Sequence, residues 1–187
     1  MNRYSYIFRL RIIQGGVIQE NSREVYEFGF EKFLSFFINT IVIILLGLYF
    51  GIVLQSLVFY VTYIVLRVYA GGYHADNPLI CFVIGIVALI PFLVAIRFYQ
   101  MWNHQVAYYA LLIAGSFIII SIAPVDHKNK RLDGIEKKIY ENRLHQNLAI
   151  VLLVAIFSSV YSINSFSIAA LCGIIFVAVT AAVGKMM

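Results

Sequence analysis

Residues 33–54 read FLSFFINTIVIILLGLYFGIVL and contain no charged side chain. A helix needs roughly 20 mainly apolar residues to cross the hydrocarbon core of a bilayer, so this run is long enough to span one. Five more apolar segments follow along the chain, at residues 57–69, 79–99, 106–124, 148–162 and 166–183. The sequence therefore predicts an all-α integral membrane protein with six transmembrane helices.

The second segment, at 57–69, is the shortest of the six, and Arg67 interrupts it. It reaches spanning length only if its helix starts at about Gln55 and ends near Ala70 or Gly71. We expect a helix of this kind to be tilted or to end in a protein-lined cavity.

The composition of the chain agrees with a lipid environment. Of the 187 residues, 62% are hydrophobic and only 12% are charged, whereas a soluble domain is about half apolar and about a quarter charged. A net charge of +5 would suit a nucleic-acid partner in a soluble protein. In a membrane protein the excess Lys and Arg gather in cytoplasmic loops beside anionic lipid, so we expect a bilayer and no nucleic acid as partner.

The positions of Lys and Arg orient the predicted helices, because cytoplasmic flanks are enriched in both residue types. With six spans, the basic residues before residue 33, those of the loop at 125–147, Arg67 and Lys185 all lie on one side of the membrane. Only Arg97 lies on the other side. Five or seven spans would break this partition, so we expect both termini in the cytoplasm.

The chain is predicted to be a single membrane domain over residues 1–187. Before the first span, Arg23, Glu27 and Glu31 fall roughly at helical spacing against aromatic and aliphatic residues. We therefore expect residues 1–32 to be an N-terminal interfacial segment with amphipathic helical character. The six-helix bundle then occupies residues 33–184 and carries its basic cytoplasmic loop at 125–147.

The chemically most informative stretch is Arg67-Val-Tyr-Ala-Gly-Gly-Tyr-His74-Ala-Asp-Asn-Pro-Leu-Ile-Cys81. On one continuous helix, residues seven apart lie about 10 Å apart along the axis, too far for an imidazole to touch a thiol. Pro78 is favoured at the first position of a helix, and Asn77 before it is a good N-cap. The pattern therefore predicts that the chain leaves one helix at the two glycines and starts the next at Pro78, with Cys81 in its first turn.

A cysteine in the first turn of a helix has its thiolate form stabilised by the positive end of the helix dipole. Folding back at the glycines would bring His74 beside Cys81, as general base and later as general acid. We expect this pair to face the cytoplasm. Arg67 is costly at membrane depth, so it is a candidate to bind a substrate carboxylate unless it simply reaches the phosphate headgroups.

Other uses of these side chains have less support in the sequence. A lone His and Cys more often pack than react, but the Gly-Gly and Asn-Pro pairs around them favour chemistry. A metal site normally needs three or four ligands, and no such set stands out, so we expect no metal and no cofactor. Cys172 lies among apolar residues with no base nearby and is expected to be structural.

Two motifs of this chain occur together in a known family. The first is Arg67, Gly71-Gly72, His74-Ala75 and Cys81, and the second is Ala123-Pro124-Val125 followed by Asn129-Lys130-Arg131 and Glu136-Lys137-Lys138. In this order and spacing they resemble the AgrB family (accessory gene regulator protein B) of bacterial quorum-sensing membrane endopeptidases. The first motif is fairly specific and the second supports it. Length and topology also agree, so the resemblance covers essentially the whole chain.

The resemblance implies a cysteine endopeptidase of the bacterial cell membrane that cleaves an AgrD-like amphipathic peptide precursor on its C-terminal side. Cys81 would be the nucleophile and would hold the peptide as an acyl-enzyme thioester, with His74 as base. A cysteine of the peptide would then attack and release a cyclic thiolactone. The expected supporting residues are Arg67, Gly71, Gly72, Asp76 and Asp126.

Several alternatives stay open at the level of sequence. Asp76 and Asp126 are equal candidates for the group that orients His74, and the basic loop at 128–143 could hold an acidic precursor tail or simply face lipid headgroups. A small transporter or channel, lined by Arg67 and the broken segment around Pro78, is the main competing function, and a non-catalytic membrane scaffold is another. The small residues of the last segment favour helix pairing, so we also expect a homodimer.

Overall fold

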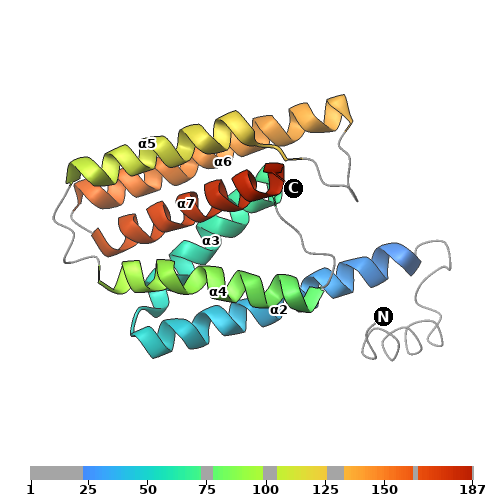
Figure 1. Cartoon of the computed structure of the whole chain (residues 1–187), viewed down its shortest axis with the longest axis horizontal. Coiled ribbons are helices and arrows are strands. Elements are labelled where there is room, and N and C mark those ends of the chain that lie inside the picture. The colour runs from blue at the N-terminus through green and yellow to red at the C-terminus, as the bar shows by residue number, and fades with distance from the viewer. Residues whose placement is uncertain (1–22, 73–77, 99–104, 126–132, 162–163, 187) are drawn as a thin grey trace. The chain divides into compact units, whose positions relative to one another are not determined.

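The computed structural model describes residues 23–72, 78–98, 105–125, 133–161 and 164–186. These residues form six α-helices, shown in Figure 1: α2 (Arg23–Phe50), α3 (Val53–Ala70), α4 (Pro78–Arg97), α5 (Gln105–Ile122), α6 (Gly134–Val160) and α7 (Asn164–Met186). The candidate residues His74, Asp76 and Asp126 lie outside the described ranges, as do residues 1–22 of the expected interfacial segment. The side chain of Cys81 also lies outside the description, although its backbone is part of α4.

The helices confirm a multi-pass membrane protein. Within the described residues, five helical segments are long and apolar enough to cross a bilayer: Phe33–Phe50, Val53–Ala70, Gln105–Ile122, Gly134–Val160 and Asn164–Met186. The remaining helix, α4, has 20 residues, of which Phe82–Arg97 forms a shorter apolar helix. The all-helical class is thus confirmed, and the sixth crossing stays a prediction.

The ends of the first two apolar helices follow from local backbone chemistry. α2 runs without a break from Arg23 to Phe50, so residues 23–32, expected to belong to a separate interfacial segment, continue directly into the first apolar helix. The turn after α2 uses Gly51 at φ +68°, a conformation that only glycine adopts without strain. α3 then starts at Val53 and ends at Ala70, which gives the weakest predicted span 18 helical residues.

The chain divides into two compact units, residues 1–45 and 46–187. In the first unit, the rings of Phe33 and Phe37 stack one helical turn apart, with their centroids 6.4 Å apart. The second unit contains α3 to α7 and every described residue of the candidate site.

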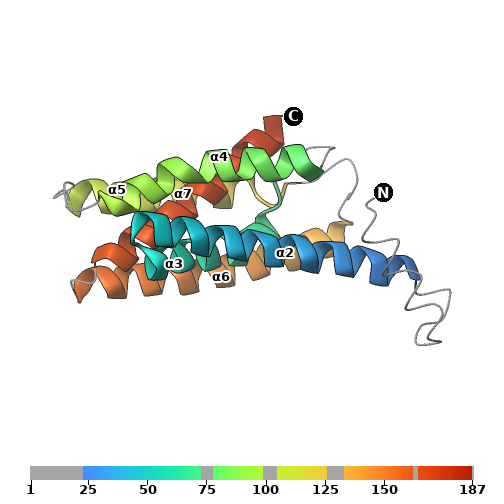
Figure 2. The ribbon, with the colours of Figure 1, turned by 90° about the horizontal axis from the view of Figure 1, so that it is seen from below.

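The second unit is organised around α7, which packs against α3, α4, α5 and α6 (Figures 1 and 2). Close approach of the helices depends on small residues. A Cβ atom added to Gly173 of α7 would lie 2.7 Å from Cγ2 of Thr62 in α3, and one added to Gly115 of α5 would lie 3.2 Å from Cγ2 of Ile174. The glycines therefore let α3 and α5 approach α7.

This packing corrects one sequence-based expectation. We expected the small residues of α7 to pair with a second copy of the chain, yet they are buried within the chain itself, namely Ala169, Ala170, Gly173, Ala178 and Ala181. The small-residue face is used to pack α7 against the helices of its own bundle. It therefore offers no surface for a partner, and the homodimer stays a prediction without this support.

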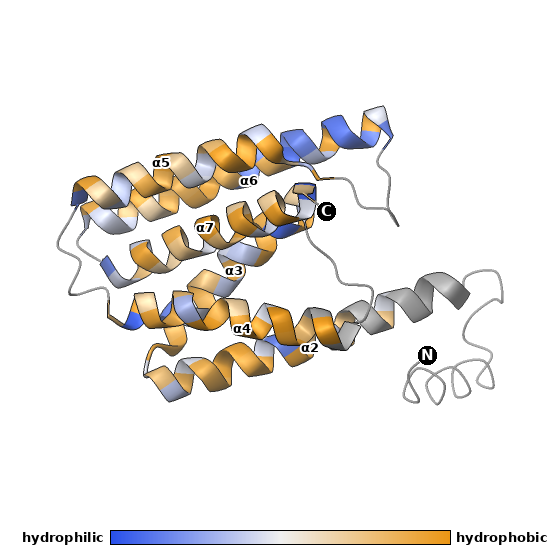
Figure 3. Ribbon diagram, viewed as in Figure 1, coloured by the Kyte–Doolittle hydropathy of each residue, from blue (hydrophilic) through white to orange (hydrophobic). Residues whose placement is uncertain are grey.

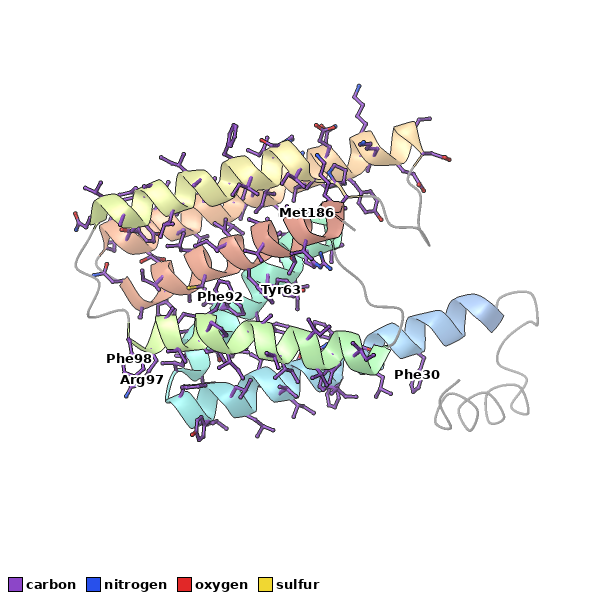
Figure 4. All side chains as sticks on the ribbon, in the orientation of Figure 1. Phe30, Tyr63, Phe92, Arg97, Phe98 and Met186 are labelled. Carbon is purple, nitrogen blue, oxygen red and sulfur yellow. The ribbon has the colours of Figure 1, made fainter. Side chains whose placement is uncertain are left out.

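Two apolar clusters fill the space around α7. One joins α3, α5, α6 and α7 through Leu66, Ala70, Ile119, Leu144, Leu148, Val151, Ile174, Val177 and Ala178. The other joins α5, α6 and α7 through Tyr108, Leu112, Ala155, Ala170 and Leu171. Between α3, α4 and α7 the rings of Phe59, Phe92 and Phe176 contact one another at centroid distances of 5.1–6.0 Å, and Tyr63 joins them at 4.8 Å from Phe176 (Figure 4).

α6 begins much earlier than the apolar segment predicted at 148–162. Asp133 is its N-cap, and its backbone N–H donates to Oε2 of Glu136 at 3.3 Å, one half of a capping box. With 27 residues, α6 is about 40 Å long, so about 10 Å of it extends beyond a hydrocarbon core of about 30 Å. Figure 3 shows that this extension, at the start of α6, is the hydrophilic part of the helix.

The two ends of the second unit differ in what they carry. One end holds the ends of α3, α5 and α7 and the beginnings of α4 and α6, and Met186 marks it in Figure 4. Arg97 and Phe98 lie at the other end of α4, remote from Met186. The helix directions thus agree with the partition of Lys and Arg, which put Arg97 alone on one side.

Candidate functional site

The chain leaves α3 at two glycines that both have a positive φ angle. Ala70 is the last helical residue, and Gly71 follows as the C-cap at φ +69°, with its N–H donating to the Arg67 carbonyl at 3.2 Å. Gly72 is at φ +127°, where other residues are strained. The predicted break between the two helices is therefore confirmed, and the two glycines are what produce it.

α4 starts at Pro78, as the sequence predicts, and Cys81 is its fourth residue. The first N–H groups of a helix have no carbonyl partner within the helix, and the dipole places partial positive charge there. Cys81 lies in this first turn of α4, as the sequence predicts. α3 ends at Ala70 and α4 begins at Pro78, so Arg67 and Cys81 belong to different helices.

Arg67, in the last turn of α3, reaches forward to the residue that follows its helix. Its Nη1 donates a hydrogen bond to the Gly71 carbonyl. The last carbonyl groups of a helix carry partial negative charge, so a guanidinium is favoured there. The expected contact of Arg67 with a substrate carboxylate or with lipid headgroups stays a prediction. Arg67 closes the turn at the end of α3.

The segment that follows α5 pairs with this turn. Val125 donates its backbone N–H to the Ala70 carbonyl at 2.9 Å, and Gly71 and Val125 form an isolated parallel β-bridge. A Cβ atom on Gly71 would lie 2.5 Å from the Val125 carbonyl oxygen. The two motifs that are 54 positions apart in the sequence therefore meet backbone to backbone, and glycine is needed at the meeting point.

The end of α7 approaches the same turn. A Cβ atom on Gly72 would lie 2.7 Å from the Thr180 carbonyl oxygen and would also overlap the guanidinium of Arg67. Gly72 itself is buried. The two glycines that precede the segment carrying His74 are thus bordered by α3, by Val125 after α5 and by the last turns of α7.

The beginning of α6 lies beside the end of α3. The rings of Tyr69 and Tyr140 meet edge to face with their centroids 5.7 Å apart, and Nδ2 of Asn147 donates to the Val65 carbonyl at 3.4 Å. The hydrophilic extension of α6, with Lys137 and Lys138 exposed, therefore starts next to the candidate site.

The structure thus brings together Arg67, Gly71 and Gly72 of the predicted set and adds two groups that the sequence did not identify. These are the N–H of Val125 and the carbonyl of Thr180. Both are backbone groups; every residue carries the carbonyl and every residue except proline carries the N–H, so residue identity gives no direct signal for them. The Ala123-Pro124-Val125 motif was noted in the sequence, but without a structural role.

Cys172 is buried in α7 at 6% exposure, within the apolar packing around that helix, as expected for a structural residue. Within the residues that the structure describes, no group of three or more His, Cys, Asp or Glu side chains could hold a metal ion.

Comparison with known proteins gives the family. The model of the family described as AgrB, accessory gene regulator B, matches residues 8–181. A putative AgrB-like protein 2 of Clostridium perfringens strain 13 is 31% identical over 146 residues, which cover 75% of this chain and 67% of the relative. A putative AgrB-like protein of C. perfringens strain SM101 is 30% identical over the same length and the same shares. No solved structure is significantly similar. The chain, a multi-pass membrane protein, belongs to the accessory gene regulator B family of quorum-sensing processing proteins.

Proposed function

We propose that this chain is a membrane cysteine endopeptidase that cleaves the C-terminal part from a short autoinducing-peptide precursor and cyclises the remaining peptide. Membership of the accessory gene regulator B family implies a role in processing such a precursor. The position of Cys81 in the first turn of α4 is the observation that carries the cysteine mechanism. The substrate is an AgrD-like amphipathic peptide with an internal cysteine.

The reaction assigns one role to each of two residues. His74 takes the proton from the Cys81 thiol, and the thiolate attacks the carbonyl carbon of the scissile peptide bond. The imidazolium then protonates the leaving amine, the C-terminal fragment departs, and the peptide stays bound to Cys81 as a thioester. His74 then takes the proton of the peptide's internal cysteine, whose thiolate attacks this thioester; Cys81 leaves as a thiolate that the imidazolium can reprotonate, and the product is a thiolactone.

The first turn of α4 supports this chemistry beyond holding the nucleophile. Its unpaired N–H groups are suitable donors for the oxyanion that forms when the scissile carbonyl is attacked. A site at the edge of the bilayer contains less water than the cytoplasm, and scarce water protects a thioester from hydrolysis before cyclisation. Both features favour acyl transfer over simple proteolysis.

The other candidate residues have supporting roles in this proposal. Arg67, Gly71 and Gly72 shape the turn that leads to His74. Asp76 and Asp126 remain the two candidates for the carboxylate that orients the imidazole. The basic loop and the start of α6 are suited to an acidic precursor tail, since Lys137 and Lys138 are exposed beside the end of α3.

The proposed arrangement in the membrane has six crossings, with α4 as the sixth. Both termini and the site then face the cytoplasm, where a newly made precursor is available. Support comes from the helix directions, because the ends of α3, α5 and α7 share one side of the second unit and Arg97 lies on the other. A homodimer is compatible with this arrangement but is not required by the mechanism.

The experiment that tests the function is precursor cleavage by single-residue variants. Cys81→Ala, Cys81→Ser and His74→Ala should each abolish cleavage of a co-expressed precursor, while each variant still inserts into the membrane. Cys172→Ala is the matched control and should cleave normally, because Cys172 is buried away from the site. Normal precursor cleavage by Cys81→Ala or His74→Ala would refute the proposed mechanism.

A further inference from the structure

We propose that Val125 is a positioning residue for the peptidase site: its backbone N–H holds the end of α3, and so fixes where the segment carrying His74 departs from the bundle. This inference rests on the proposed function, in which His74 acts on Cys81. It goes beyond that function by assigning a role to the segment after α5, which contributes no side chain to the chemistry.

The hydrogen bond between Val125 and Ala70 satisfies a group that has no other partner within its helix. The last four carbonyls of a helix are left without intrahelical donors, and Ala70 is the final residue of α3. Ala70 has 0% of its surface exposed, so water does not compete for its carbonyl. A buried carbonyl is costly to leave unpaired. The N–H of Val125, at 2.9 Å, therefore sets the position of the helix end.

The fit at this point leaves no room for adjustment. Gly71 lies directly opposite Val125 in the parallel bridge, and a Cβ atom there would be 2.5 Å from the Val125 carbonyl oxygen and 3.3 Å from its nitrogen. From another direction, Arg67 holds the Gly71 carbonyl, and the Thr180 carbonyl borders Gly72. The two glycines are thus held from three sides, and Val125 is the only one of the three that belongs to the α5–α6 connection.

The distance from this junction to His74 is short. His74 follows Gly72 by two residues, and two residues of extended chain reach at most about 7 Å. A displacement of Gly71 and Gly72 therefore moves the point from which the segment carrying His74 departs. Misplacement of a catalytic group by about 1 Å can lower a rate about 100-fold. The Val125 contact is expected to matter mainly for the rate of the chemical step.

The bundle itself does not depend on this one contact. Beneath the junction, α3, α5, α6 and α7 are joined by an apolar cluster that includes Leu66, Ile119 and Leu144, each 0% exposed. Loss of one backbone hydrogen bond is a small perturbation beside such a cluster. A variant without the Val125 N–H should therefore fold and insert, and its defect should appear in kcat.

The experiment compares two variants at the same position in reconstituted vesicles. Val125→Pro removes the N–H donor, whereas Val125→Ala keeps it and shortens the side chain. We expect Val125→Pro to lower kcat for precursor cleavage by about 10- to 100-fold with little change in KM, and Val125→Ala to stay within about twofold of the parent chain.

A second pair of variants tests the same contact from the other strand and covers the case in which Val125→Pro fails to fold. Gly51 and Gly71 both have a positive φ, +68° and +69°, which alanine adopts only with strain. Alanine at Gly51 meets no atom within 4 Å, whereas alanine at Gly71 meets Val125. Both substitutions place an alanine at positive φ, but only the alanine at Gly71 also meets Val125, so Gly71→Ala should lower kcat and Gly51→Ala should not.

A substrate-independent readout separates this inference from the proposed function. In the Cys172→Ala background, the rate of Cys81 alkylation by iodoacetamide is followed against pH. Displacement of His74 should move the pH midpoint of alkylation upward in Val125→Pro and Gly71→Ala, and leave it unchanged in Val125→Ala and Gly51→Ala. Precursor cleavage that survives Cys81→Ala would end the proposed function. Parent-like kcat and parent-like alkylation midpoints in Val125→Pro and Gly71→Ala would overturn the role of Val125 alone.

Discussion

The contact between α3 and α7 gives the most quantitative prediction, because the short distances around Gly173 require glycine there. An alanine Cβ at Gly173 would lie 2.7 Å from Cγ2 and 2.8 Å from Cβ of Thr62, and 3.1 Å from the backbone oxygen of Phe59. Carbon atoms pack best at about 3.5–4.0 Å, so the overlap is close to 1 Å. Thr62 is β-branched and stiff, and a helix carbonyl cannot move by itself. The two helices would have to separate.

Overpacking of this kind costs about 1–3 kcal/mol. Alanine also raises helix propensity, by up to about 1 kcal/mol relative to glycine, which would hide part of the effect. Gly85 of α4 supplies the control, because a Cβ atom there meets nothing within 4 Å. Both substitutions lie inside helices and gain the same propensity. Their difference in stability therefore isolates the packing of α3 against α7.

The assay is equilibrium unfolding in mixed micelles with increasing sodium dodecyl sulfate, followed by circular dichroism. Gly173→Ala should be less stable than Gly85→Ala by about 1–3 kcal/mol, and Gly85→Ala should equal or exceed the parent chain. Equal stability of the two variants would refute the close α3–α7 contact, and with it the helix arrangement that encloses the site.

Three further predictions follow from described residues. Cys172, at 6% exposure, should resist a bulky maleimide in the folded protein and react after unfolding; fast labelling in the folded state would contradict its burial. Tyr140→Ala should lose about 0.5–1.5 kcal/mol of stability through the Tyr69 contact, and Tyr140→Phe should keep it; equal unfolding curves for these two variants would count against the contact. A topology reporter fused after Lys137 should report a cytoplasmic location, and an external location would exclude the six-span topology.

Much of the fold could be predicted from the sequence because it depends on local patterns. Apolar runs of spanning length located the helices, and the two glycines together with Pro78 located the break between α3 and α4. The short second segment extended to Val53 and Ala70 as its length required. In these cases a few adjacent residues determine the backbone, so the prediction needs no tertiary information.

Other features depended on information that an apolar scan does not use. The first turns of α6 are polar, so the predicted span began 14 residues after the helix does, although Asp133 and Glu136 carry the capping-box pattern that marks the true start. The small residues of α7 were interpreted as a dimer face because composition alone does not say whether the partner helix belongs to the same chain. Their burial shows that the helices packed against them, α3 and α5, belong to the same chain.

The pairing of Gly71 with Val125 is the feature that sequence reasoning had least chance to find. It is made by backbone groups of two segments that are far apart in the chain, and no side chain marks it. The requirement for glycine at Gly71 is visible only when Val125 is placed against it. The catalytic assignments to His74 and Cys81, in contrast, come from residue chemistry and family membership, and they stay proposals that experiment must test.

The most direct test of the central proposal is mass spectrometry of the protein incubated with a precursor whose internal cysteine is replaced by alanine. Without that cysteine the thioester has no intramolecular acceptor and should accumulate. The proposal predicts an adduct with the mass of the precursor's N-terminal portion on the proteolytic fragment that contains Cys81, none on the fragment that contains Cys172, and none in His74→Ala. Cleavage of the precursor without an adduct on Cys81, or with the adduct on Cys172, would contradict it.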